Sequence, residues 1–205
     1  MSVQVSYKKQ VTLGIIGITI LLLAIEIIAN VWWATQIHCE FEQNEIFQDF
    51  DEMEKRQLCL DFYNLKTSDD ALIPNQSTES ITINSLGFRG AEFFTIKPLD
   101  TYRIFMVGGS TMFGAGATSD ETTIPTYLQQ LLNEKDFGFD IEVINSGIQG
   151  ADSTTELNLI ERKLVRFSPD LIIIYDGWND LRANNAPMEV KENWETICKF
   201  GKEND

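Results

Sequence analysis

Three short loops, rich in glycine and small polar residues, carry the side chains with which this sequence could do chemistry. They are Gly108-Gly109-Ser110-Thr111, Asn145-Ser146-Gly147 and Gly177-Trp178-Asn179-Asp180. Ser110 lies in a glycine-flanked turn, where a hydroxyl can project while backbone N–H groups stay free. Gly147 could bring its N–H close to a reacting carbonyl, and Asn179 could donate from its side-chain amide. A serine nucleophile with convergent donors is the arrangement that acyl transfer requires.

Strand and helix patterns alternate around these loops. Short apolar, β-prone runs predict buried strands over residues 102–107, 140–144 and 171–175. Apolar spacing predicts helices over 123–135 and 152–167, the second with Asp152 as its N-cap, and a last helix from about Glu189. The first helix is expected to place its apolar residues on one face: Ile124, Tyr127, Leu128, Leu131 and Leu132. This order is typical of an α/β fold with a parallel sheet, which brings the loops together at the carboxyl ends of its strands.

The same loops resemble the first three sequence blocks of the SGNH (GDSL-like) hydrolase superfamily. Gly108-Gly109-Ser110 stands where the family has Gly-Asp-Ser, and Gly147 matches the glycine of the second block. Gly177-Trp178-Asn179-Asp180 matches the third block, Gly-x-Asn-Asp, and Asn84-Ser85-Leu86-Gly87-Phe88-Arg89 resembles the Asn-x-x-Gly-Phe-Arg lead-in of membrane-associated members. The resemblance covers roughly residues 81–187. It implies a three-layer, flavodoxin-like sheet and a serine esterase or deacylase. Ser110 would attack an ester, and an oxyanion hole would form from the N–H groups of Ser110 and Gly147 and the side chain of Asn179.

Two departures from the family pattern bear on activity. Gly109 replaces the aspartate of the first block, which affects the loop geometry more than the nucleophile. The fourth motif of the family, Asp-x-x-His, has no match, and His38, the only histidine, lies far upstream. Because serine is a weak nucleophile without an adjacent base, the 205 residues alone are not expected to be active. The catalytic Asp and His are expected beyond residue 205, where the broken β/α alternation also predicts further sheet.

A second hypothesis is that the protein has the SGNH-like fold but no catalytic activity. The missing histidine, Gly109 and the acidic segment after the apolar run also fit a catalytically inactive SGNH-like subunit that acts in binding or assembly of a membrane complex. A nucleotide- or flavin-binding module is disfavoured, because the loops lack GxGxxG and GxxxxGK[ST], and no cofactor is expected. No Cys/His cluster indicates a metal site.

An apolar run over residues 11–33 predicts one transmembrane helix, because about 23 helical residues span a bilayer core. Lys8 and Lys9 precede it and acidic residues follow it, so the positive-inside rule makes residues 1–10 cytoplasmic and the rest extracellular or periplasmic. A cleaved signal peptide is the competing interpretation, but the run is long and ends in Asn-Val-Trp-Trp, a poor cleavage site. The sequence thus predicts an acidic juxtamembrane segment over 34–80 and the SGNH-like domain over 81–205.

Charge and the remaining motifs limit the partners. A net charge of −15 opposes binding to nucleic acid. The resemblance indicates an acyl ester, or an acetylated glycan or lipid, as substrate, and the anchor indicates membrane lipid. Glu26 in the apolar run indicates contact with another membrane protein, helped by an amphipathic stretch within residues 40–60, although packing of that stretch on the domain is the simpler interpretation. The apolar residues of that stretch are Ile46, Phe47, Phe50, Met53 and Leu58.

Three cysteines, Cys39, Cys59 and Cys198, bear on the compartment. Cys39 and Cys59 could pair near the membrane if the domain lies in an oxidising compartment. Unpaired thiols fit the sequence equally well, because spacing alone fixes no connectivity.

Overall fold

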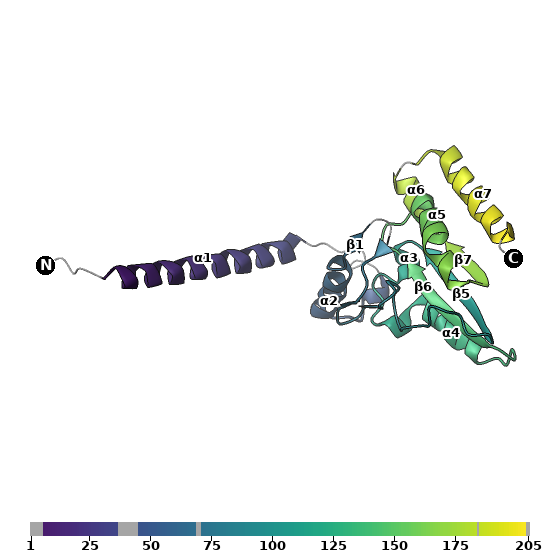
Figure 1. Ribbon diagram of the computed structural model, residues 1–205, viewed down its shortest axis with the longest axis horizontal. Coiled ribbons are helices and arrows are strands. Elements are labelled where there is room, and N and C mark those ends of the chain that lie inside the picture. Colours follow the sequence, from purple (N-terminus) through teal and green to yellow (C-terminus); the bar gives the residue numbers. More distant parts are fainter. Residues whose placement is uncertain (1–5, 37–44, 69–70, 184, 204–205) are drawn as a thin grey trace. The chain divides into compact units, whose positions relative to one another are not determined.

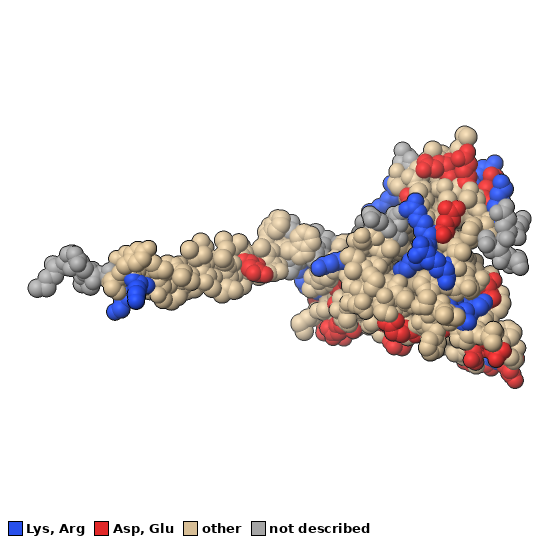
Figure 2. Space-filling model, viewed as in Figure 1, with Lys and Arg blue, Asp and Glu red and all other residues tan. Residues whose placement is uncertain are grey.

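The computed structural model describes residues 6–36, 45–68, 71–183 and 185–203, and the chain divides into two units, Met1–Phe47 and Gln48–Asp205 (Figure 1). The first unit consists of α1 (Tyr7–Gln36) and a short 3₁₀ helix, η2 (Glu45–Phe47). Helix α1 extends beyond the predicted 11–33 at both ends. By length and composition Tyr7–Trp33 could cross a membrane, a property that a signal sequence shares. Figure 2 shows its surface as almost entirely uncharged between one basic end and a single acidic spot.

A three-stranded parallel sheet forms the centre of the second unit. The strands are β5 (Thr101–Gly108), β6 (Asp140–Gly147) and β7 (Leu171–Tyr175), in the order β6-β5-β7. All three predicted strands are confirmed, and the pairings Gly108↔Gly147 and Gly108↔Tyr175 align their carboxyl ends. The segments that begin at Gly108 and Gly177 therefore lie at one edge of the sheet, as the alternating pattern predicted. Asn145-Ser146-Gly147, which was predicted as a loop, forms the last three residues of β6 at the same edge.

Alternation of side chains along β5 gives the sheet two buried faces. Ile104 and Met106 point to one cluster, which α4 (Ile124–Asn133) covers with Leu128 and Leu132. Phe105 and Val107 point to the opposite cluster, which contains residues of α5 (Ser153–Arg162), η4 (Leu164–Phe167) and α7 (Pro187–Glu203). Since successive residues of a strand face opposite sides, one apolar strand supports both layers of helices. The domain is a three-layer α/β fold, as expected.

Two helix faces differ from the predictions. In α4 only Leu128 and Leu132 pack on the sheet, whereas Ile124, Tyr127 and Leu131 are exposed. A ten-residue helix on an edge of the sheet covers it with a narrow stripe, so the predicted five-residue face was too wide. In α2 (Glu52–Tyr63), Leu58 is buried but Met53 is 79% exposed. The expected stretch over residues 40–60 is thus a 3₁₀ helix and a separate α-helix that begins at an Asp51 capping box, with residues 40–44 outside the described part.

The segment before β5 holds two small antiparallel pairs and the lead-in motif. The pairs are β1 (Thr67–Ser68) with β2 (Ala71–Leu72) and β3 (Gln76–Ser77) with β4 (Thr82–Ile83). Asn84 closes the turn that follows, since its Oδ1 accepts from the N–H groups of Leu86 and Phe88 at 3.0 Å. Gly87 has φ +76°, and a side chain there would press on the Leu72 carbonyl and on the Lys163 amine. The motif is a tight turn that delivers Phe88 to the core and Arg89 to the end of β6.

Two cysteines fall within the described residues. Cys59 of α2 is disulfide-bonded, and Cys198 of α7 is free and exposed. Cys39, which the sequence left as a possible partner of Cys59, lies outside the described residues, as does His38.

Candidate active site

Ser110 and Asn179 line one small cavity of about 240 Å³ at the carboxyl edge of the sheet. Ser110 is the first residue of α3 (Ser110–Phe113), directly after β5, and Asn179 lies in α6 (Trp178–Ala183), a helix that was not predicted and that follows β7. The cavity is lined by Gly109, Ser110, Thr111, Tyr175, Asp176, Trp178 and Asn179. The structure therefore brings together the predicted nucleophile and the predicted side-chain donor.

Gly109 allows the close approach of these two loops. A Cβ atom at this position would overlap the side-chain nitrogen of Asn179. That nitrogen donates to the Ala151 carbonyl at 2.6 Å, which fixes the amide beside the turn before α5. An aspartate, which the family has here, would displace Asn179 in this arrangement.

Gly147 is placed differently from Ser110 and Asn179. It is buried, it does not line the cavity, and its N–H donates to Oδ1 of Asn145 at 3.0 Å. A Cβ atom at Gly147 would overlap the backbone of Phe113 in α3. In this conformation the N–H of Gly147 is not free for a substrate, and the glycine serves to let β6 and α3 pack closely.

Gly150 is a donor candidate that the sequence reasoning missed. It is exposed, has φ +74°, and precedes Ala151, whose carbonyl Asn179 contacts. The signal in the sequence was the second glycine of Gly147-Ile148-Gln149-Gly150, three residues further along the same loop.

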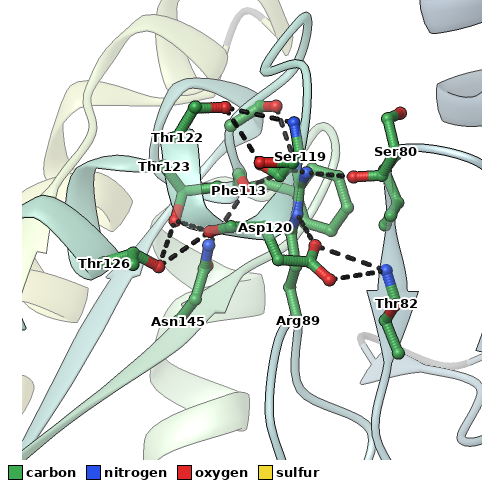
Figure 3. Close-up of polar contacts among 12 residues, drawn as sticks. Ser80, Thr82, Arg89, Phe113, Ser119, Asp120, Thr122, Thr123, Thr126 and Asn145 are labelled. Atoms are coloured by element: carbon green, nitrogen blue, oxygen red, sulfur yellow. Dashed lines mark hydrogen bonds and ion pairs between the residues drawn. The ribbon is translucent and has the colours of Figure 1, made fainter.

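The guanidinium of Arg89 holds α3 from its carboxyl end (Figure 3). Its side chain is buried, and its terminal nitrogens donate to backbone carbonyls at 2.8–3.3 Å, namely those of Ser80, Phe113, Gly114 and Ser119. Its Nε bonds Oδ1 of Asp120 at 2.8 Å. Burial lowers the pKa of Arg89, and the hydrogen bond and charge of Asp120 oppose that shift. The positive charge lies against the last carbonyls of α3, where a helix end is negative.

Asn145 connects this network to the sheet. Its side-chain nitrogen donates to the Phe113 carbonyl at 3.0 Å, which also accepts from Arg89, and its Oδ1 takes the Gly147 N–H. The end of β6 and the lead-in motif therefore hold one carbonyl at the end of α3, three residues after Ser110 (Figure 3). Neither Arg89 nor Asn145 was predicted to act on the position of the serine.

Asp180, the last residue of the third block, anchors α6 to α5. Its carboxylate accepts from the N–H of Ser153 at 3.2 Å and from the Ser153 hydroxyl at 2.7 Å. It is buried, and Asn185 adds a further bond at 3.1 Å. Asp180 thereby positions Asn179 and is turned toward α5. Among the described residues, no group of three or more His, Cys, Asp or Glu is arranged to hold a metal ion.

A parallel three-layer α/β fold with a serine and an asparagine amide at the strand ends defines a class, the hydrolases of SGNH type. Residues 106–203 match the family model described as the GDSL-like Lipase/Acylhydrolase family. This region, a little under half of the chain, is thus of the SGNH (GDSL-like) hydrolase superfamily.

Two solved structures resemble part of the chain. AlinE4, an SGNH-hydrolase family esterase, is 25% identical over 52% of this chain and 56% of its own, with a TM-score of 0.44. TesA is 25% identical over 50% of this chain and 55% of its own, with a TM-score of 0.45. The match thus spans little more than half of each of these structures. No curated protein matches the chain.

Replacing Arg89 tests its role. Arg89→Met keeps the apolar stem but removes the hydrogen bonds to four carbonyls and to Asp120 together with a buried positive charge, so we expect the free energy of unfolding to fall by about 3–5 kcal/mol. Arg166→Met, at an exposed arginine of η4, should change it by less than about 0.5 kcal/mol. Urea unfolding followed by tryptophan fluorescence measures both. Equal effects of the two substitutions would contradict the role given to Arg89.

Proposed function

We propose that this protein is a membrane-anchored, extracytoplasmic serine esterase or deacylase in which Ser110 attacks the acyl carbon. The observation that carries the proposal is the shared cavity of Ser110 and Asn179. A hydroxyl on the first residue of a helix lies beside that helix's free N–H groups, which favour developing negative charge. The asparagine amide adds a neutral donor from the neighbouring strand end. Together they suit an ester carbonyl whose oxygen becomes negative on attack.

The oxyanion would receive the N–H of Ser110 and the side chain of Asn179. Gly147 was predicted as the third donor, and it could serve only after Asn145 released its N–H. Gly150 is an alternative third donor, because it is exposed and next to the carbonyl that Asn179 contacts, although it, like Gly147, is not among the residues that line the cavity. The general base has to be a further group, since the described residues include no histidine. Tests of activity therefore need the protein at its full natural length.

The substrate is an acyl ester carried by a glycan or a lipid. Trp178 and Tyr175 line the cavity and are 73% and 60% exposed. Such rings offer apolar area with a polar edge, which suits the carbon face of a sugar or an acyl chain at a membrane surface. Glu26 and residues 40–60 stay predicted contacts with a membrane-protein partner.

The location follows from three features. Helix α1 is long and apolar enough to span a bilayer, and Lys8 and Lys9 lie at its N-terminal end. The disulfide at Cys59 supports an oxidising compartment for the second unit. We infer that the N-terminus is cytoplasmic and that the domain lies outside or in the periplasm.

Labelling with a fluorophosphonate tests the nucleophile. The full-length protein should be labelled, Ser110→Ala should not, and Ser77→Ala, an exposed serine of β3, should be labelled like the wild type. Asn179→Ala should slow labelling by about 10²–10³-fold, because it removes an oxyanion donor. Label that survives Ser110→Ala would contradict Ser110 as the nucleophile. A wild type that never reacts would contradict the esterase and favour the inactive binding subunit.

The exposed thiol of Cys198 reports the side of the membrane. A maleimide that does not cross membranes should label intact cells or spheroplasts expressing the protein, and Cys198→Ser should remove that label. Labelling only after the membrane is permeabilised would place the domain in the cytoplasm and contradict the proposed orientation.

A further inference from the structure

Glu156 of α5 is a carboxyl group without an obvious partner. Its side chain is completely buried, and neither of its oxygens has a hydrogen-bond partner when the group is counted as an acceptor. A buried carboxylate that accepts no hydrogen bond is strongly unfavourable. Something in the structure must therefore offset the burial of this side chain.

Asp176 is the group that faces Glu156. It follows β7 directly and lines the cavity with Ser110 and Asn179, while its Oδ2 is buried and also lacks a partner. A hydrogen bond with Asp176 is among the causes that raise the pKa of the Glu156 carboxyl group. Two carboxylates cannot satisfy each other, because both only accept. One proton on Glu156 makes it a donor and provides a partner for both orphaned groups at once.

The surrounding charges favour that proton. Burial is the largest cause that raises the pKa of Glu156, to about 9, and the charges of Asp176, Asp180 and Asp152 raise it further. Asp180 accepts hydrogen bonds from the N–H and the hydroxyl of Ser153. Asp152 caps α5, and its pKa is lowered, with burial opposing and the bonds from Thr155 and Asn185 favouring the charged form. No cation is among the main influences on Glu156, so its neutral form is the stable one.

We propose that Glu156 keeps its proton through neutral pH and donates it to Asp176, so that this acid pair places one negative charge, and not two, beside Ser110. Glu156 is then a positioning residue that acts through Asp176. The consequence for catalysis rests on the proposed function. An ester under attack by Ser110 develops negative charge, and a second carboxylate nearby would raise the energy of that state. Glu156 would thus keep the cavity suitable for an oxyanion up to alkaline pH.

Stability measured against pH tests the pair without any assumption about activity. The folded state holds the proton to about pH 9, whereas the unfolded chain releases it near 4.5. Between these values the folded state binds more protons, so rising pH destabilises it. Glu156→Gln keeps a donor for Asp176 and cannot ionise. Melting temperatures are measured on full-length protein in non-ionic detergent. The melting temperature of Glu156→Gln minus that of the wild type should rise by several degrees between pH 5 and pH 9.

Glu161→Gln, an exposed glutamate of the same helix, is the matched control and should track the wild type at every pH. A constant difference between Glu156→Gln and wild type would overturn the proposal, because it would show an ionised Glu156. Should Glu156→Gln fail to fold, Asp176→Asn provides the second test. It removes a charge that raises the pKa of Glu156, so its melting temperature should fall less steeply with pH than that of the wild type.

The rate of ester hydrolysis against pH tests the catalytic consequence. The rate of each protein on a neutral ester is compared with its own rate at pH 7. The wild-type rate should decline near pH 9, and the rate of Glu156→Gln should not. If neither the wild type nor the variants hydrolyse esters but the melting temperatures behave as expected, the proposed function is wrong and the shared proton between Glu156 and Asp176 is supported. If hydrolysis is present and both proteins decline alike, the catalytic role of the pair is wrong.

Discussion

The buried guanidinium of Arg89 bonds carbonyls from segments that are far apart in the sequence, and the position of the candidate nucleophile depends on it. It joins the loop before β4, the end of α3 and the short 3₁₀ helix η3 (Asp120–Thr122) (Figure 3). Helix α3 has four residues, too few to be stable alone. Fixing its last carbonyls also fixes Ser110 at its first residue. The planar, five-donor head of arginine suits this arrangement in a way that lysine does not.

Glycines permit the close packing that completes the arrangement. Gly147 lets the end of β6 lie against the backbone of α3, and Gly109 lets the side chain of Asn179 lie against the turn before Ser110. Both contacts exclude a Cβ atom on steric grounds. The site is thus positioned by backbone contacts on one side and by the arginine on the other. Asp176 lines the cavity, and the proposed proton on the buried Glu156 would limit the negative charge beside Ser110.

The sequence predicted the fold better than the details of the site. Strands β5 to β7 and the cap at Asp152 follow from local apolar runs and a short polar side chain, which are visible in the chain. By contrast, which apolar side chains of α4 are exposed depends on how much of the sheet the helix covers. The bond between Gly147 and Asn145 and the role of Arg89 depend on contacts between distant segments, which periodicity does not encode. The first and third sequence blocks pointed to Ser110 and Asn179, and both residues line one cavity in the structure. Their catalytic roles stay a prediction.

The most direct measurement is a crystal structure of the full-length protein after reaction with a phosphonate ester that mimics the oxyanion. We expect phosphorus bonded to Oγ of Ser110 and a phosphonyl oxygen within about 3 Å of the Asn179 side-chain nitrogen and of the Ser110 N–H. Arg89 should keep its bonds to the end of α3. An adduct on another residue, or an oxygen directed away from Asn179, would contradict the roles given to Ser110 and Asn179.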